Sequence, residues 1–95
     1  MEPRRIWEMG GVSFSQANAI NNPGTVVGFF TLPDFSDTHA FVWSSKGGMK
    51  DLNNLIPANS GWDLQSANGI GNNGRIVGNG TINGEFHAFL LIPNK

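Results

Sequence analysis

The sequence of 95 residues contains no cysteine, which excludes a disulfide framework, a thiolate zinc site and a cysteine nucleophile. It is also poor in charge, because only 14% of its residues are Asp, Glu, Lys or Arg, where about 25% is usual in soluble domains. The net charge is −1, and Arg4-Arg5 is the only adjacent basic pair. Nucleic-acid binding needs a concentrated positive surface, so we expect no nucleic-acid partner.

Long apolar segments are missing as well. The longest apolar run, near Ala88 to Ile92, is far too short to span a membrane, so we expect no membrane insertion. The first seven residues, Met1 to Trp7, lack the apolar stretch of a signal peptide. We therefore expect the chain to be soluble as it stands, either as a cytoplasmic protein or as a piece of a longer exported one.

Glycine, with 13 residues, and asparagine are abundant, and they punctuate an internal repeat. The segment 17–28, Ala-Asn-Ala-Ile-Asn-Asn-Pro-Gly-Thr-Val-Val-Gly, recurs 50 residues later at 67–78, as Ala-Asn-Gly-Ile-Gly-Asn-Asn-Gly-Arg-Ile-Val-Gly. The tripeptide His-Ala-Phe at 39–41 recurs 48 residues later at 87–89. The chain therefore contains two copies of one structural unit.

Short apolar runs between Gly- and Asn-rich turns indicate β-strands, because these turn residues accept the positive φ that hairpins require. No stretch shows a sustained helical period, so we expect little helix. Residues 1–95 are expected to form one all-β unit with repeats at about 12–55 and 62–95. The predicted strands are, in chain order, 17–20, 25–31, 39–44, 49–52, 67–70, 75–81 and 86–92.

The strand predicted at 86–92 is apolar on both of its faces, which is typical of a strand covered on both sides. Four-stranded antiparallel meander repeats with covered inner strands favour β-propeller-like blades, and a small β-sandwich or barrel is the alternative. The second repeat lacks its own fourth strand, so we expect residues 4–11 to be a displaced outer strand. Two blades cannot close a ring of about four to eight, which predicts a homo-oligomer or a fragment of a longer repeat array.

The repeated blocks resemble the HAF-repeat family of extracellular repeat proteins, which is named for its His-Ala-Phe tripeptide. The resemblance covers nearly the whole chain: an Ala-x-x-Ile-x-x-x-Gly-x-Val-Val-Gly block, His-Ala-Phe leading into an apolar strand, and Gly-Gly-Met-Lys-Asp-Leu at 47–52. The ending at 89–93, Phe-Leu-Leu-Ile-Pro, is similar to the last repeat of such an array. The resemblance implies a propeller-like architecture and an extracellular or cell-surface setting, and it implies no established activity.

His39 and His87 occupy the same repeat position, next to Phe41 and Phe89. A metal site needs several converging ligands, and no Cys, His or Glu stands at a ligand spacing from either histidine apart from Glu85, two residues before His87. We therefore expect no metal and no cofactor. We interpret His39, Phe41, His87 and Phe89 as a structural motif, in which each buried imidazole bonds a backbone group. Ligand binding and catalysis are the alternatives, and catalysis would require positioned partners.

The long segment 56–63 between the repeats is the best candidate for ligand binding. It presents Trp62 beside Asp63 and Asn59. An exposed indole with amide and carboxylate neighbours is typical of sugar sites, where the ring stacks and the polar groups form hydrogen bonds. The alternative is that Trp62 closes the end of the hydrophobic core.

These observations favour a non-catalytic β-repeat domain that acts as a binding or surface scaffold for a protein or glycan ligand. The first alternative is a small carbohydrate-binding lectin with sites between the blades. The second alternative is a hydrolase. The sequence disfavours it, because neither paired carboxylates nor a nucleophile with a neighbouring base can be recognised, and we expect no catalytic residue.

Overall fold

The computed structural model describes residues 14–31 and 37–93, which form β-strands connected by turns and one short 3₁₀ turn. The all-β prediction, with little helix, is therefore confirmed. In the described residues, no helix is long and apolar enough to cross a lipid bilayer. The elements follow one another as β1 (Phe14–Ile20), β2 (Val26–Thr31), β3 (Thr38–Ser44), β4 (Gly48–Asp51), η1 (Leu52–Leu55), β5 (Trp62–Ile70), β6 (Ile76–Ile82) and β7 (Glu85–Leu91).

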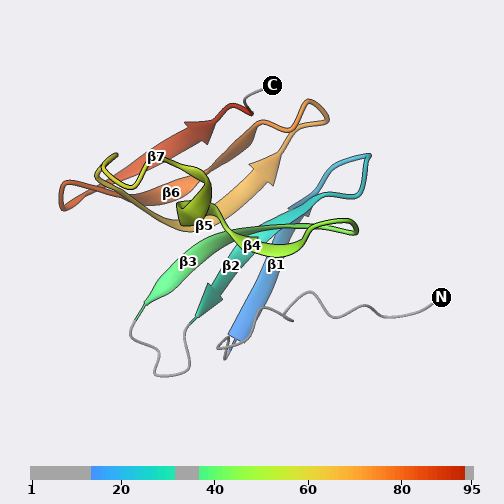
Figure 1. The fold of residues 1–95 in the computed structure, drawn as a ribbon, viewed down its shortest axis with the longest axis horizontal. Coiled ribbons are helices and arrows are strands. Elements are labelled where there is room, and N and C mark those ends of the chain that lie inside the picture. The colour runs from blue at the N-terminus through green and yellow to red at the C-terminus, as the bar shows by residue number, and fades with distance from the viewer. Residues whose placement is uncertain (1–13, 32–36, 94–95) are drawn as a thin grey trace.

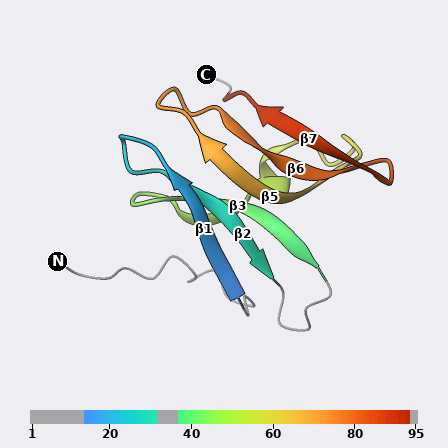
Figure 2. The same cartoon turned by 180° about the vertical axis from the view of Figure 1, so that it is seen from behind.

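The strands form two antiparallel meanders that do not close on themselves. The first sheet has the order β1-β2-β3-β4, and the second has the order β5-β6-β7. The two sheets lie one above the other at an angle, with η1 beside the junction (Figures 1 and 2). The expectation of two four-stranded sheets is correct for the first sheet and wrong for the second, which has three strands among the described residues. The outer strand predicted at 4–11 lies outside the described residues.

Turns fall at the three predicted Asn- and Gly-containing segments, 22–24, 72–74 and 83–84. Asn83 and Gly84 both have positive φ, 51° and 86°, which is the conformation of the two-residue type I′ turn between β6 and β7. In the two longer turns, Gly24 and Gly74 have φ of 90° and 86°. Residues without a side chain adopt this region at no steric cost, so these glycines fix where β2 and β6 begin.

β5 begins at Trp62, five residues before the start predicted from the repeat. Its pairing with β6 shifts register twice, between Leu64 and Ser66 and between Ala67 and Gly69. Each β-bulge adds one residue to the strand and reverses the inward and outward alternation after it. The period of two that identifies a half-buried strand is therefore hidden in the sequence of β5, and the first half of the strand was missed.

Phe41 in the first sheet and Phe89 in the second are both buried, because a glycine lies opposite each ring. Phe41 pairs with Gly28, and Phe89 pairs with Gly78, at the same register. A Cβ on Gly28 would lie 1.9 Å from the Gln16 carbonyl oxygen and 2.9 Å from the Phe41 ring. On Gly78 it would lie 2.7 Å from the Phe89 ring. The glycines therefore allow both the neighbouring strand and the ring to approach the backbone closely.

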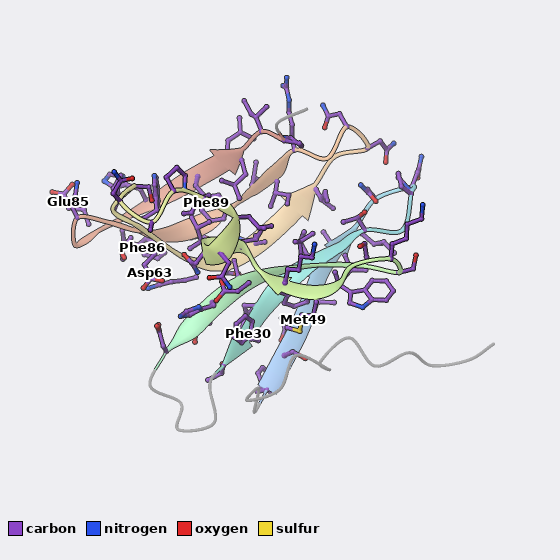
Figure 3. The ribbon with its side chains drawn as sticks, in the orientation of Figure 1. Phe30, Met49, Asp63, Glu85, Phe86 and Phe89 are labelled. Atoms are coloured by element: carbon purple, nitrogen blue, oxygen red, sulfur yellow. The ribbon has the colours of Figure 1, made fainter. Side chains whose placement is uncertain are left out.

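The main hydrophobic core lies between the two sheets. The first sheet contributes Val27 and Ala40, both with no exposed surface, and the second contributes Leu64, Ala67, Ile76 and Phe89 among others. A second cluster lies on the opposite face of the first sheet and contains Val26, Phe30 and Phe41, with Trp43 and Met49 packed against it. Figure 3 shows Phe30 and Met49 on this far side. The first sheet is thus apolar on both faces, whereas β7, the strand predicted to be covered on both sides, is exposed at Phe86 and Leu90.

Residues at the same repeat position meet where β1 approaches β5. The Asn21 side-chain amide donates to the Gly71 carbonyl at 3.1 Å, and the Asn22 backbone N–H donates to Asn72 Oδ1 at 2.9 Å. The Asn18 amide donates to the Ala67 carbonyl at 2.9 Å. The partners of the first two bonds are 50 residues apart, which is the spacing of the sequence repeat, and Ala67 precedes Asn68, the equivalent of Asn18. The two sheets therefore lie side by side in matching positions at this edge.

Candidate functional site

His39 is held between two carboxylates at the start of β3. Its Nδ1 lies 2.5 Å from Asp51 Oδ2, and its Nε2 lies 2.7 Å from Asp37 Oδ2. Asp51 ends β4 and pairs with Phe41, two residues after His39 in β3. Residues two apart in a strand point to the same side, so the hairpin places Asp51 on the same face as His39. Both ring nitrogens bond an acceptor in this arrangement. An imidazolium, which has two N–H donors, satisfies both contacts.

The pKa of His39 is raised above its ordinary value by this environment. Burial alone lowers the pKa, because removal from water disfavours the charged ring. The hydrogen bonds to Asp51 and Asp37 act in the opposite direction, as do the negative charges of these carboxylates, and together they outweigh burial. The structure therefore favours the protonated form of His39 as a bridge between the two carboxylates.

The carboxylate of Asp51 continues this network into the second sheet. Its Oδ1 caps η1 by accepting from the Asn53 backbone N–H at 2.9 Å and from the Asn53 amide at 3.0 Å. The Asn53 side chain in turn bonds the backbone of Leu64 in β5, donating to its carbonyl at 2.9 Å and accepting from its N–H at 2.7 Å. His39, Asp51 and Asn53 thus connect β3 to β5 through side chains alone.

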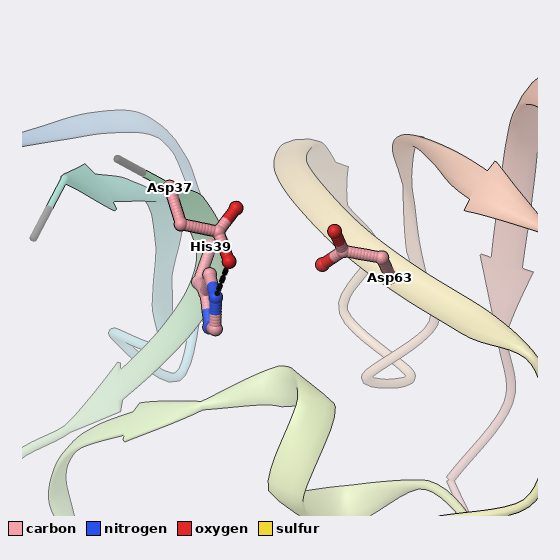
Figure 4. A group of neighbouring side chains, drawn as sticks. All are labelled: Asp37, His39 and Asp63. Atoms are coloured by element: carbon pink, nitrogen blue, oxygen red, sulfur yellow. Dashed lines mark hydrogen bonds and ion pairs between the residues drawn. The ribbon is translucent and has the colours of Figure 1, made fainter. Parts of the chain in front are cut away.

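Asp63 faces this cluster from the second sheet (Figure 4). Ligand atoms of Asp37, His39 and Asp63 all lie within 4.8 Å of one another. One imidazole and two carboxylates are donors that divalent transition metals accept, and a carboxylate on the other ring nitrogen, here Asp51, is a usual companion of a metal-bound histidine. The same group also suits a protonated His39, because the Asp37 carboxylate accepts a hydrogen bond from His39 Nε2. The set is not recognisable in the sequence, because Asp63 is 24 residues from His39 and reaches it only through the packing of the sheets.

The histidine of the second repeat has a different environment. His87 is 54% exposed, and its one bond among the described residues is a contact of 3.3 Å between Nε2 and Glu85 Oε1. The expectation that both histidines are buried against backbone groups is therefore wrong. His39 bonds carboxylates because β4 and η1 bring Asp51 beside it, whereas no strand pairs with the outer edge of β7 within the described residues.

The predicted binding segment is divided by the fold. Trp62 is the first residue of β5, partly buried against the core, with its ring 6.1 Å from that of Phe89 in an edge-to-face arrangement. Asp63 follows it and points to the opposite side of the strand, toward His39. Asn59 lies exposed in the preceding turn. The structure thus places Trp62 at the end of the core and does not bring the three side chains into one site.

Two open grooves border the junction of the sheets. One has a volume of about 430 Å³ and is almost wholly apolar, with Leu52, Ile56, Ile76 and Leu91 among its residues. The other, of about 390 Å³, combines aromatic with amide and hydroxyl side chains. Its lining residues are Phe29, Thr38, Gln65, Ser66, Asn79 and Phe86. Thr38 stands between Asp37 and His39 in the chain, so this mixed groove begins beside the carboxylate–histidine cluster.

Comparison with known proteins gives no relative. No family model, no curated protein and no solved structure matches this chain.

Proposed function

We propose that the chain is a non-catalytic β-repeat scaffold of the HAF type, in which the two sheets are neighbouring blades of a propeller-like stack. The observation that carries this proposal is the row of hydrogen bonds between equivalent positions, Asn21 to Gly71 and Asn22 to Asn72. Repeats that are stacked side by side place equivalent residues against one another, because each repeat meets the next through the same edge. We also propose an extracellular or cell-surface setting, on the basis of the resemblance to the HAF-repeat family.

The environment of His39 supports a structural role over catalysis. A nucleophile needs a neighbouring base with a free ring nitrogen, and both nitrogens of His39 contact carboxylates. Asp37 and Asp51, in turn, accept from His39, whose protonated ring offsets part of their negative charge. These contacts hold β3, β4 and η1 together, which is what a scaffold requires.

The stack can be tested with a disulfide, because the chain has no cysteine of its own. Asn18 and Asn68 are equivalent residues whose side chains lie in contact at 3.5 Å. Under mild oxidation, the double variant Asn18→Cys/Asn68→Cys should form an intramolecular disulfide, detected by mass and by mobility on a non-reducing gel. The mismatched pair Asn18→Cys/Asn83→Cys, with Asn83 in the β6–β7 turn, should stay reduced. Equal cross-linking of both pairs would contradict the stacked arrangement.

The mixed groove favours carbohydrate binding as a second candidate function. Phe29 and Phe86 offer apolar rings for stacking, while Gln65 and Asn79 offer amides that donate and accept hydrogen bonds. Sugars present apolar ring faces and a rim of hydroxyl groups, so aromatic and amide side chains are suited to bind them. This would place the ligand in the groove between the sheets, and away from Trp62.

A glycan array probed with the purified chain tests this second candidate. Phe86→Ala and Gln65→Ala should each weaken any retained glycan. Leu55→Ala is the matched control, because Leu55 is also an exposed apolar residue and lies outside the mixed groove. Equal loss in all three variants, or no glycan retained by the parent chain, would reject the lectin assignment. Turnover of glycoside or ester substrates by the parent chain would overturn the non-catalytic proposal itself.

A further inference from the structure

Three carboxylates lie around the imidazole of His39, and one positive charge at most is present to balance them. Asp37 and Asp51 accept from the two ring nitrogens, and Asp63 faces the same cluster from β5. Within residues 14–31 and 37–93, Asp37 and Asp51 form ion pairs with His39 alone, and Asp63 forms none. Three negative charges against one positive charge leave the cluster negative, at a place where all four side chains are partly buried. Such a cluster attracts a further cation, because partly buried charges repel one another more strongly than charges in water.

The donor atoms of Asp37, His39 and Asp63 can converge on one ion. They lie within 4.8 Å of one another and come from both sheets (Figure 4). The ligand atoms of a four-coordinate zinc site lie about 3.3 Å apart, because each is about 2.0–2.1 Å from the metal. The widest separation must therefore shorten by up to about 1.5 Å, and the 2.7 Å contact between Nε2 and Asp37 must open slightly. Rotation of an aspartate side chain is sufficient for both changes.

The imidazole of His39 is already oriented for a metal. With its proton on Nδ1, a neutral ring donates to Asp51 Oδ2 at 2.5 Å and has Nε2 free to coordinate. A carboxylate in this position fixes the ring and raises its basicity toward the metal. Asp51 is held in turn by the Asn53 backbone N–H at 2.9 Å. The ring of Phe30, which is buried, lies 5.5 Å from the imidazole and limits its rotation from another side.

We propose that Asp37, His39 Nε2 and Asp63 bind a divalent transition-metal ion, such as zinc, between the first and the second sheet. The ion takes the place of the proton on Nε2, which passes to the solvent, and water completes the coordination. The nitrogen donor favours zinc and its neighbours over Mg²⁺ and Ca²⁺, which prefer oxygen ligands throughout. The side chain of Asp37 is 42% exposed, so the ion can reach the site from the solvent.

An ion at this place would fasten the two sheets together. Asp37 and His39 belong to the start of β3, and Asp63 belongs to β5, so the metal bonds would join strands that are far apart in the sequence. Binding to the folded chain alone raises its stability by mass action. The inference goes beyond the scaffold proposal. It also departs from the sequence-based expectation of no metal, because Asp63 joins the histidine only in the folded chain.

The first experiment is calorimetric titration of the metal-free chain with zinc chloride. The parent chain should bind one zinc ion. Asp63→Asn keeps the size of the side chain and removes one ligand, so zinc affinity should fall at least about tenfold. Glu85→Gln is the matched control, because Glu85 stands two residues before His87 just as Asp37 stands before His39, and it should bind zinc like the parent chain. Equal zinc affinity of the parent chain and Asp63→Asn would overturn the site.

The second experiment locates the ion. On addition of zinc, the ¹⁵N resonances of the His39 ring should shift and those of His87 should not, and Tm should rise in the parent chain but not in Asp63→Asn. Asp37→Asn takes over as the ligand variant if circular dichroism shows that Asp63→Asn is unfolded. Zinc binding that is lost in Glu85→Gln would place the ion at His87 and overturn the proposal. Tighter binding of Ca²⁺ or Mg²⁺ than of zinc would overturn the assigned class of ion.

Failure of the metal site is distinguishable from failure of the scaffold proposal. The disulfide of Asn18→Cys/Asn68→Cys tests the stack in metal-free buffer, and zinc titration of the parent chain tests the site. A disulfide that forms, together with a parent chain that binds no zinc, rejects the metal site and leaves the stacked repeats intact. Zinc binding that depends on Asp63, together with a disulfide that does not form, supports the site and rejects the row of equivalent contacts.

Discussion

The side chain of Asn53 pairs with the backbone of Leu64 as a neighbouring strand would. Its amide donates to the Leu64 carbonyl at 2.9 Å, and its carbonyl accepts from the Leu64 N–H at 2.7 Å. Leu64 is a core residue with 1% of its surface exposed, so its backbone groups have little access to water. One asparagine therefore satisfies two polar groups at the point where η1 meets β5.

Replacement of Asn53 by alanine should destabilise the fold. The substitution leaves the Leu64 N–H and carbonyl without these partners, and an unsatisfied buried polar group costs about 1–3 kcal/mol. Urea unfolding followed by circular dichroism measures the change. Asn54→Ala is the control, because Asn54 lies exposed in the same 3₁₀ turn and should leave the midpoint nearly unchanged. Similar midpoints for both variants would mean that the pairing with Leu64 contributes no net stability.

The His39 cluster should make stability depend on pH. The pKa of His39 is raised in the folded state, so His39 binds its proton more tightly there than in the unfolded chain. This contribution is fully present below the unfolded pKa of about 6.5, and it is lost as the pH rises through the higher folded value. Denaturation midpoints measured across this range should therefore fall on the alkaline side.

Variants assign that pH dependence to one group. His39→Gln should remove it, and Asp51→Asn should reduce it, because Asp51 supplies the largest of the contacts that raise the pKa of His39. His87→Gln should retain the pH dependence of the parent chain, since His87 is exposed and contacts Glu85. A fall in stability that persists in His39→Gln would place its origin elsewhere in the chain.

Gly28 and Gly78 should both resist substitution by alanine. A Cβ would lie 1.9 Å from the Gln16 carbonyl at Gly28 and 2.0 Å from the Ser66 carbonyl at Gly78, and backbone cannot yield as a flexible side chain can. Overpacking of this kind costs about 1–3 kcal/mol or more, which corresponds to a drop in Tm of about 4–8 °C per kcal/mol in a domain of this size. Gly47→Ala is the control, because its nearest neighbour is the Ser44 hydroxyl at 3.1 Å. An unchanged Tm for both core variants would contradict the close strand approach.

The strands and turns that sequence predicted best are those fixed by local chemistry. Asn83-Gly84 specifies its turn by itself, since both residues tolerate positive φ, and the β-branched Val26-Val27 and Ile76-Val77 favour extended strands. β5 was only half predicted, because its two bulges conceal the alternation of its side chains. Local pattern is thus informative wherever the strand is regular.

The carboxylate–histidine cluster could not be predicted, because its members come together only through tertiary packing. Asp51 reaches His39 through the β3–β4 hairpin, and Asp63 reaches it through the packing of two sheets. The repeat also suggested equal roles for His39 and His87, although the second sheet has no counterpart of Asp51 among the described residues. Equivalent sequence positions have equivalent environments only when the neighbouring elements are repeated too.

Trp62 should contribute to stability, and Asn59 in the same segment should not. The indole packs edge-to-face on Phe89 at the end of the core, and partial exposure should keep the cost of Trp62→Ala at about 2–3 kcal/mol, below the 3–5 of a fully buried aromatic ring. Asn59→Ala removes an exposed side chain and should stay within about 0.5 kcal/mol of the parent. Chemical denaturation of both variants, alongside binding of any glycan the parent chain retains, separates packing from recognition. Loss of binding in Trp62→Ala at unchanged stability would return Trp62 to a ligand site, because a ring that only closes the core affects binding through folding.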